Sequence, residues 1–208
     1  AALSKAASSP ELAHRSDPFS LSSPVRSGFR LGYVRSWVEG SADPEVERAA
    51  LSFVEDLEAR GFEVVEVDLP EHELFRRNWY FIRRAEASEV HEHWILERPE
   101  EYGPDVRRML EEGLGIRAVD YVRAVRMREV LRGSVEGALR DLDALVLPAS
   151  PLTAPEVGTK TVLVGGREVD VYTALLSFTM PFNLTGHPAV VVPYTLSSEG
   201  LPISMQLV

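Results

Sequence analysis

Near the start of the chain, the pattern of hydrophobic and polar positions alternates between strand and helix. The segment 29–34 predicts a short strand, and the alternation of apolar and acidic residues at 62–69 predicts a second one. Between them, Asp43 is a favourable N-cap for a helix that ends at Gly61. The apolar face of this helix consists of Val46, Ala50, Phe53 and Leu57. A strand, a helix and a strand within about forty residues predict a βαβ unit with parallel strands.

Helical periodicity dominates the middle of the chain. It predicts helices over about 74–95, 104–112 and 119–139. The run of apolar residues at 144–147, immediately before Pro148, is continuous rather than alternating. A continuous apolar run of this length is typical of a strand that is buried on both faces.

The last part of the chain returns to strand patterns. They cover 161–171, 189–193 and 203–208. Gly165-Gly166 divides the first of them into the two alternating runs of a β-hairpin. We find no internal repeat and no second composition regime. The sequence therefore predicts one α/β domain over 29–208, after a lead-in or linker at 1–28.

Composition narrows the possible functions. The 208 residues contain no cysteine, which excludes a disulfide scaffold, a cysteine-ligated zinc site and a thiol nucleophile. With 22 basic and 32 acidic residues, the formal net charge of −10 argues against a nucleic-acid partner. No apolar run approaches the roughly 20 residues that span a bilayer, and residues 1–10 lack the features of a signal peptide. We therefore expect a cytoplasmic protein without a membrane partner.

Several short motifs suggest chemistry but have simpler explanations. Residues 113–118 fit a loose dinucleotide-binding pattern, but a helical pattern precedes them, so we interpret them as a helix C-cap and connection. His91 and His93 point about 200° apart on a helix, which favours a solvated face over a metal site. His187 is interpreted as a loop histidine rather than a general base. We interpret the glycosylation sequon at 183–185 as coincidental.

Three longer segments are more specific, and they cover 142–151, 178–193 and 200–208. The second of them reads Phe-Thr-Met-Pro-Phe-Asn-Leu-Thr-Gly-His-Pro-Ala-Val-Val-Val-Pro. The order and spacing of these segments resemble the C-terminal half of the amidase signature family. Weaker matches lie at 16–18, 85–87, 102–113 and 120–128. The resemblance covers nearly the whole chain and implies an α/β fold in which the chain forms part of a mixed β-sheet with covering helices.

The resemblance implies an amide hydrolase with a Ser–cis-Ser–Lys triad, in which a neutral lysine accepts a proton through a bridging serine. Such a site needs a lysine upstream of a loop in which glycines flank the serines. The adjacent serine pairs of this chain are Ser8-Ser9, Ser22-Ser23 and Ser197-Ser198, and none lies in a glycine-rich loop. We therefore assign no catalytic residue, and the resemblance implies no metal or organic cofactor. Because a strand pattern runs up to Val208, we also expect the polypeptide to continue.

The side chains expected at the substrate pocket follow the predicted strands. Ser150 comes directly after the buried strand, and ligands of open α/β sheets lie outside the carboxyl ends of strands. The turn expected at 179–186 carries three further candidates: Thr179, Phe182 and Asn183. The alternative is that Asn183 and Thr185 only form hydrogen bonds with the local backbone.

The family also includes one component of the tRNA-dependent amidotransferases, their A subunit. For that component, the resemblance leads us to expect an acidic residue just before Thr-x-Pro-x-Asn to hold the ammonium group of glutamine. Residues 174–178 contain no acidic residue, and an unpaired ammonium group would be costly to bury. This departure favours an aliphatic or aryl amide over glutamine as the substrate.

The leading hypothesis is that this chain is the substrate-pocket half of a hydrolase that cleaves non-peptide carbon–nitrogen bonds of amides. The complete protein would act through a serine acyl-enzyme. The partners would be a small-molecule amide and the missing N-terminal catalytic portion. The alternative is a noncatalytic binding or regulatory remnant that kept the fold and lost the triad. The sequence leaves the particular amide and the oligomeric state open.

Overall fold

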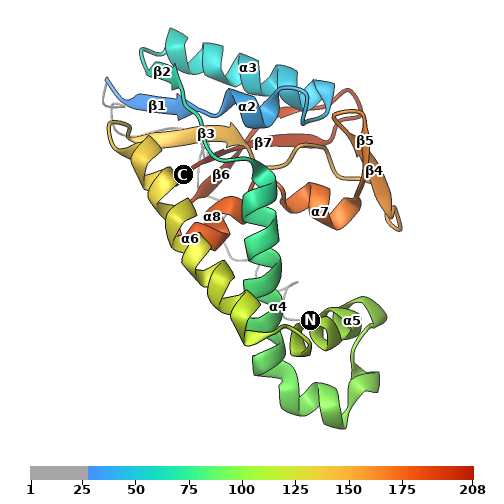
Figure 1. Ribbon diagram of the computed structural model, residues 1–208. Coiled ribbons are helices and arrows are strands. Elements are labelled where there is room, and N and C mark those ends of the chain that lie inside the picture. Colours follow the sequence, from blue (N-terminus) through green and yellow to red (C-terminus); the bar gives the residue numbers. More distant parts are fainter. Residues whose placement is uncertain (1–27) are drawn as a thin grey trace, which may run out of the picture.

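The central feature of the computed structural model, which describes residues 28–208, is a mixed five-stranded sheet (Figure 1). Its strands are β1 (Arg30–Tyr33), β2 (Glu63–Glu66), β3 (Ala144–Pro148), β6 (Val190–Leu196) and β7 (Pro202–Leu207). They follow the order β2-β1-β3-β7-β6. β1 pairs in parallel with β2 and with β3, whereas β7 pairs antiparallel with β3 and β6. The predicted parallel βαβ unit and the mixed sheet implied by the resemblance are confirmed.

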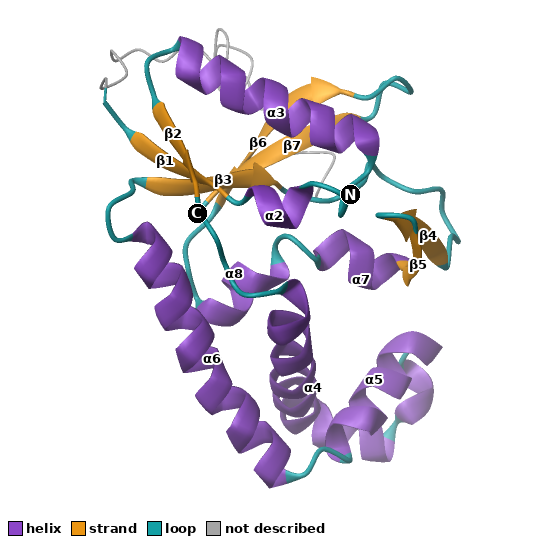
Figure 2. Cartoon of the chain, turned by 45° about the horizontal axis from the view of Figure 1, so that its top comes forward, coloured by secondary structure: helices purple, strands orange, loops and turns teal. Residues whose placement is uncertain are grey.

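The helices cover the sheet and extend away from it. They are α2 (Arg35–Val38), α3 (Pro44–Ala59), α4 (His72–Glu97), α5 (Pro104–Leu114), α6 (Ala118–Leu139), α7 (Val171–Leu176) and α8 (Met180–Thr185). A short 3₁₀ turn at Pro99–Glu101 separates α4 from α5. α3 lies along one face of the sheet and α8 lies on the other (Figure 2). α4 and α6 lead away from the sheet, and α5 packs against α4 at the far end (Figure 1).

Helix α3 begins and ends where its sequence predicts. The carboxylate of Asp43 accepts a hydrogen bond from the Glu45 N–H at 2.8 Å, and Pro44 occupies the first helical position. After the helix, Gly61 adopts φ +87°, a left-handed conformation that favours glycine. The inward face of α3 packs against the central strands, where Leu145 and Leu147 of β3 are fully buried. This layer is the hydrophobic core that holds the end of β3 in place.

Helices α4 and α5 approach each other closely because α5 carries Gly113 at the contact. A β-carbon at this position would collide with the Ser88 hydroxyl and with the backbone carbonyl of Arg84. The Ser88 hydroxyl donates a hydrogen bond to the Leu110 carbonyl at 2.8 Å across the same contact. The backbone N–H of Gly115 then caps α5. The interpretation of 113–118 as a helix end and connection is therefore confirmed.

The remaining strands form a separate hairpin beside the sheet. β4 (Thr161–Val164) pairs antiparallel with β5 (Arg167–Asp170), and the turn between them is Gly165-Gly166 with φ +56° and +72°. This matches the hairpin predicted from the two glycines. The hairpin leads directly into α7, whose N-cap is Asp170.

One expectation is corrected by the structure. The segment 179–186 is not a turn: α8 occupies Met180–Thr185, with Pro181 in its first turn and Gly186 at φ +75° after its last residue. Helices α2 and α7 were not anticipated either. All three are too short for a hydrophobic period of 3.6 residues to repeat, and this repetition is the signal from which a helix is predicted.

Some expectations fall outside the described residues. The lead-in expected at 1–28 lies there except for Gly28, as does the weak family match at 16–18. Within 28–208, no helix is both long enough and apolar enough to cross a bilayer.

Candidate functional site

A buried glutamine of β7 joins the two segments that carry the predicted pocket residues. Gln206 is 1% exposed, and its Nε2 donates hydrogen bonds to the Pro148 carbonyl at 3.1 Å and to the Phe178 carbonyl at 2.9 Å. Pro148 ends β3 two residues before Ser150, and Phe178 immediately precedes Thr179. The side-chain amide of Gln206 therefore fixes the end of β3 and the start of the α8 segment relative to each other.

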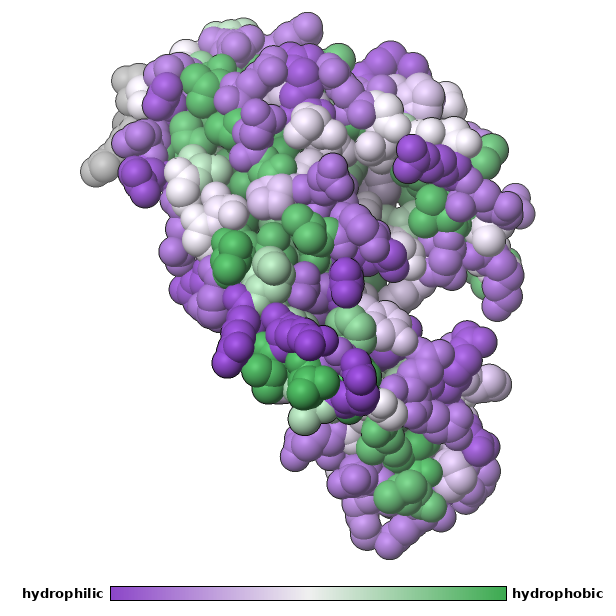
Figure 3. Space-filling view, viewed as in Figure 1, coloured by the Kyte–Doolittle hydropathy of each residue, from purple (hydrophilic) through white to green (hydrophobic). Residues whose placement is uncertain are grey.

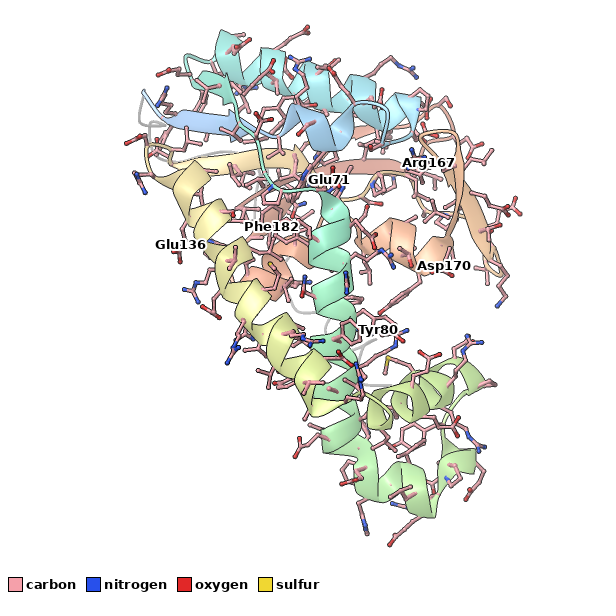
Figure 4. All side chains as sticks on the ribbon, in the orientation of Figure 1. Glu71, Tyr80, Glu136, Arg167, Asp170 and Phe182 are labelled. Carbon is pink, nitrogen blue, oxygen red and sulfur yellow. The ribbon has the colours of Figure 1, made fainter. Side chains whose placement is uncertain are left out.

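Three of the four predicted site residues lie on or next to α8. The Asn183 N–H donates to the Thr179 carbonyl at 3.2 Å, and the Thr179 hydroxyl bonds the Leu176 carbonyl at 3.4 Å. Phe182 is 1% exposed, and its ring centroid lies 6.1 Å from that of Trp37. Figure 4 places Phe182 beside the N-terminal end of α4. Phe182 is thus a core residue that supports α8, whereas Asn183 is exposed.

Asn183 lines a hollow of about 470 Å³ between α8, α4 and α6. Trp79 and Arg83 of α4 and Arg128 of α6 also line this hollow. Within 28–208, the side-chain amide of Asn183 forms no hydrogen bond with protein atoms, so both its donor and its acceptor are available to a ligand. The alternative that both Asn183 and Thr185 only bond the local backbone holds for Thr185. Its hydroxyl donates a hydrogen bond to the Pro181 carbonyl at 2.9 Å.

A second and larger cleft, of about 760 Å³, lies between α4 and α5 on one side and the β4–β5 hairpin and α7 on the other. The space-filling view in Figure 3 shows it as a notch in the outline of the molecule. Arg83 lines this cleft as well as the Asn183 hollow, together with Lys160 and Tyr172. Arg83 therefore lies at the junction of the two cavities.

Ser150 lies at the carboxyl end of β3, half-buried, as the sequence predicts. Its hydroxyl accepts a hydrogen bond from the Leu152 N–H at 3.4 Å, and the adjacent Pro151 carbonyl accepts one from the Asp43 N–H at 2.7 Å. Ser150 lines neither of the two cavities. Gln206 thus joins the segments that carry Ser150 and Thr179, but Ser150 and Asn183 do not line one cavity.

The histidines are held by local contacts. His187 Nδ1 lies 2.8 Å from the Thr185 hydroxyl, and burial lowers the pKa of this imidazole. His91 Nδ1 lies 2.9 Å from the Tyr102 hydroxyl, while His93 Nε2 lies 3.3 Å from a Glu97 carboxylate oxygen. His91 and His93 thus have different partners, as expected for residues two apart on a helix. In the described part of the chain, acidic and histidine side chains form no group of three that could hold a metal ion.

One further histidine was not anticipated. His72 begins α4, and its ring lies 4.0 Å from the Trp37 ring and 5.5 Å from the Phe178 ring, between centroids. Burial lowers the pKa of His72 to about 4, so its imidazole is neutral at physiological pH. It packs as an aromatic group beneath the segment that leads into α8.

Sequence comparisons agree with this architecture. The family model described as Amidase matches residues 3–208. An amidase of Pseudomonas putida is 33% identical over 196 residues, which cover 89% of this chain and 42% of that protein. The A subunit of the glutamyl-tRNA(Gln) amidotransferase of Agathobacter rectalis is 27% identical over 205 residues, which cover 87% of this chain and 40% of that protein.

Solved structures show the same likeness. The crystal structure of an amidase superimposes with a TM-score of 0.83 at 35% identity, over 88% of this chain and 42% of that one. With its mixed sheet, its covering helices and this match, the chain belongs to the amidase family. It spans about two fifths of the length of the curated relatives it matches.

Two residues at the site were missed by sequence reasoning. Gln206 lies inside a segment that was recognised as similar to the family, but a strand pattern alone does not show that a glutamine points inward. Arg83 lies in a helix rich in arginine, where Arg76, Arg77 and Arg84 give the same local signal. The distinguishing contacts of Arg83 come from α7, almost ninety positions later in the chain.

Proposed function

We propose that this chain forms the substrate-pocket half of an amidase that converts R–CO–NH₂ and water into a carboxylate and ammonium. The observation that carries the proposal is the family match over residues 3–208, which covers about two fifths of the relatives' length. The nucleophilic serine, the bridging serine and the lysine would lie in the polypeptide that precedes this chain. The reaction would pass through an acyl-enzyme formed by that serine.

The exposed β6 edge of the sheet supports the proposal that the catalytic residues lie in a separate part of the polypeptide. Within 28–208, no strand pairs with the outer side of β6, yet Val190 and Val191 are 56% and 51% exposed. Leu196 at the end of the same strand is 64% exposed. Natural proteins protect sheet edges with charged residues, proline, bulges or a covering element, because an open apolar edge promotes pairing with another chain. Pro193 and the register shift between Pro193 and Thr195 interrupt the second half of β6, whereas Val190–Val192 contain neither a charge nor a proline. We infer that the strands of the catalytic half continue the sheet at β6.

The residues of this chain would bind and orient the substrate. The side-chain amide of Asn183, which forms no hydrogen bond within 28–208, offers a donor and an acceptor, and Thr179 lies one helical turn before it. Ser150 would contribute from the end of β3, whose position relative to the Thr179 segment is fixed by Gln206. Phe182 would act from within the core, by fixing α8 against Trp37. An aliphatic or aryl amide and a cytoplasmic location stay predictions.

The test uses two polypeptides: residues 1–208 alone, and the natural polypeptide that includes the preceding region. We expect the longer polypeptide to release ammonia from benzamide with saturation and to gain one adduct, by intact mass, from a serine-directed fluorophosphonate. Residues 1–208 alone should show neither. An adduct on the short polypeptide would contradict the absence of a nucleophile here. Absence of both signals in the longer polypeptide would favour the noncatalytic remnant.

A further inference from the structure

The guanidinium group of Arg83 lies in an unusual environment. Its Cζ lies 4.2 Å from the centroid of the Trp79 ring and 5.6 Å from that of the Tyr172 ring. Its Nη1 donates to the Tyr172 hydroxyl at 3.2 Å, while its Nε is buried and has no hydrogen-bond partner among the described residues. Burial lowers the pKa of Arg83 from its ordinary value. This cation is therefore partly desolvated and lacks one of its hydrogen bonds.

The neighbouring Arg84 shows what a paired arginine looks like in the same helix. Its Nε lies 3.0 Å from a carboxylate oxygen of Glu112, and its Cζ lies 3.9 Å from the centroid of the Tyr80 ring. Arg83 has an aromatic platform too, but in the described part of the chain no carboxylate lies within 4.0 Å of it. Arg84 thus has a carboxylate partner, Glu112, and Arg83 has no equivalent carboxylate among the described residues.

The acidic side chains that line the larger cleft are already bound elsewhere. Glu112 pairs with Arg84, and Asp105 pairs with Arg108 at 3.2 Å. Asp170, which Figure 4 labels beside α7, accepts from the Thr173 N–H at 2.9 Å and from the Thr173 hydroxyl at 3.0 Å.

Two cations in this lining remain. Lys160 also lines the cleft, and within 28–208 neither Lys160 nor Arg83 has a carboxylate partner within 4.0 Å. The cleft lining contains four cations and three carboxylates, and Arg83 and Lys160 are the two cations that form no ion pair within 28–208.

We propose that Arg83 and Lys160 form a carboxylate-binding subsite that selects amides carrying a negatively charged group. A guanidinium fork binds a planar carboxylate through two parallel hydrogen bonds, and an aromatic face behind it holds the fork in orientation. Because Arg83 also lines the Asn183 hollow, one substrate would reach both groups, with its carboxylate at Arg83 and its amide toward α8. This inference rests on the proposed function and narrows its substrate class.

The inference agrees with the lack of an acidic residue at 174–178. A site that held an ammonium group would need a carboxylate there, whereas a site for an anion would be weakened by one. The expected aliphatic or aryl amide would thus carry a carboxylate in place of an amino-acid head group.

The test compares the natural full-length polypeptide with its Arg83→Gln and Arg83→Lys variants. Arg76→Gln is the matched control, because Arg76 lies on the same helix, lines neither cavity and pairs with Glu73 at the surface. The substrates are ω-carbamoyl carboxylates with two to five methylene groups, each compared with the diamide of the same length. Binding of succinate and glutarate is measured separately by calorimetry, so that the result does not depend on turnover.

We expect at least one carboxylate to have a KM about tenfold below that of its diamide. Arg83→Gln should abolish this preference and weaken dicarboxylate binding about tenfold. Arg83→Lys should restore part of the preference. Arg76→Gln should match the parent.

Equal dicarboxylate binding by the parent and Arg83→Gln would overturn the inference even if amides are hydrolysed. So would binding of inorganic phosphate that depends on Arg83 but does not compete with the amide, because the anion would then be an effector. Binding without any amide hydrolysis would keep the subsite and reject the proposed function.

Discussion

The two edges of the sheet are built in opposite ways. At the β2 edge, Glu63 and Glu66 are exposed and form ion pairs with arginines of β1 and α2: Arg30 at 2.9 Å and Arg35 at 2.6 Å. The β6 edge contains no charged residue at all, and Val190 and Val191 are more than half exposed. The first edge has the charged character by which proteins end a sheet. The second edge lacks charge and is interrupted only at Pro193, where its register with β7 shifts.

The difference indicates which edge of the sheet is suited to contact with water. A charged edge is compatible with water, so β2 needs no further strand. Exposed valines on an edge strand leave apolar surface and backbone groups in water, and both are stabilised when another strand pairs there. The comparison therefore supports the proposal that the catalytic half joins at β6. Three substitutions and one change of pH test how stability is distributed between these edges and the core.

The largest effect is expected from Val191→Lys in the longer polypeptide. If β6 is an inner strand there, the lysine loses its hydration without a partner, and the free energy of unfolding should fall by about 2–5 kcal/mol. Urea unfolding followed by circular dichroism measures this. Glu63→Lys on β2 is the control, and its cost should stay below about 1 kcal/mol. Equal costs at the two edges would refute the comparison.

The next effect is a loss of stability at low pH that depends on neither edge. Burial lowers the pKa of His72 to about 4 in the folded chain. Between pH 6.5 and 4, His72 is therefore protonated in the unfolded chain but neutral in the folded chain. The contribution of His72 is complete above pH 6.5 and is lost as the pH falls toward 4, up to about 3 kcal/mol. Melting temperatures of the parent and His72→Phe across this range should converge near neutrality and diverge in acid. Parallel curves would mean that folding does not lower the pKa of His72.

A smaller loss is expected from Gln206→Ala, one strand inward from the β6 edge. The substitution leaves the Pro148 and Phe178 carbonyls without their donor, at a cost of about 2 kcal/mol. Amide hydrolysis should decline further than stability does, because Ser150 and Thr179 lose their common anchor. The kcat and the urea midpoint, measured on the same preparation, separate the two effects. An unchanged kcat at reduced stability would show that the anchor is only structural.

The smallest effect is expected from Glu66→Gln at the charged edge. Its partner Arg35 also binds Glu39, and both side chains of the broken pair are exposed, so the loss should be below about 1 kcal/mol. High salt should reduce even this difference, because exposed charges are screened. A loss above about 2 kcal/mol would mean that the β2 edge relies on its ion pairs for more than solubility.

Local patterns were sufficient to predict most of the sheet and the long helices. The alternation at 62–69, the apolar run at 144–147 and the cap at Asp43 each act within a few neighbours, and the structure contains the expected element at each place. Helix α8 was missed because six residues hold less than two turns, and its limits are set by Pro181 and Gly186.

The cavities were beyond prediction for a different reason. The contacts of Gln206 join three segments, and the site of Arg83 needs α4, α7 and the hairpin in their folded positions. A single sequence shows which residue types are present but not which of several arginines lacks a partner. Among the four predicted pocket residues, the structure places Asn183 in a cavity, Phe182 in the core, and Ser150 and Thr179 near the Gln206 bridge.

Hydrogen exchange at the two edges tests the central claim most directly. The amide hydrogens of β6 that point away from β7 would be followed in the longer polypeptide, together with the outward amide hydrogens of β2. The account predicts that the β6 amides exchange as slowly as those of the inner strand β3, while the β2 amides exchange fast. Fast exchange at β6 in the longer polypeptide would contradict the claim that the catalytic half continues the sheet there.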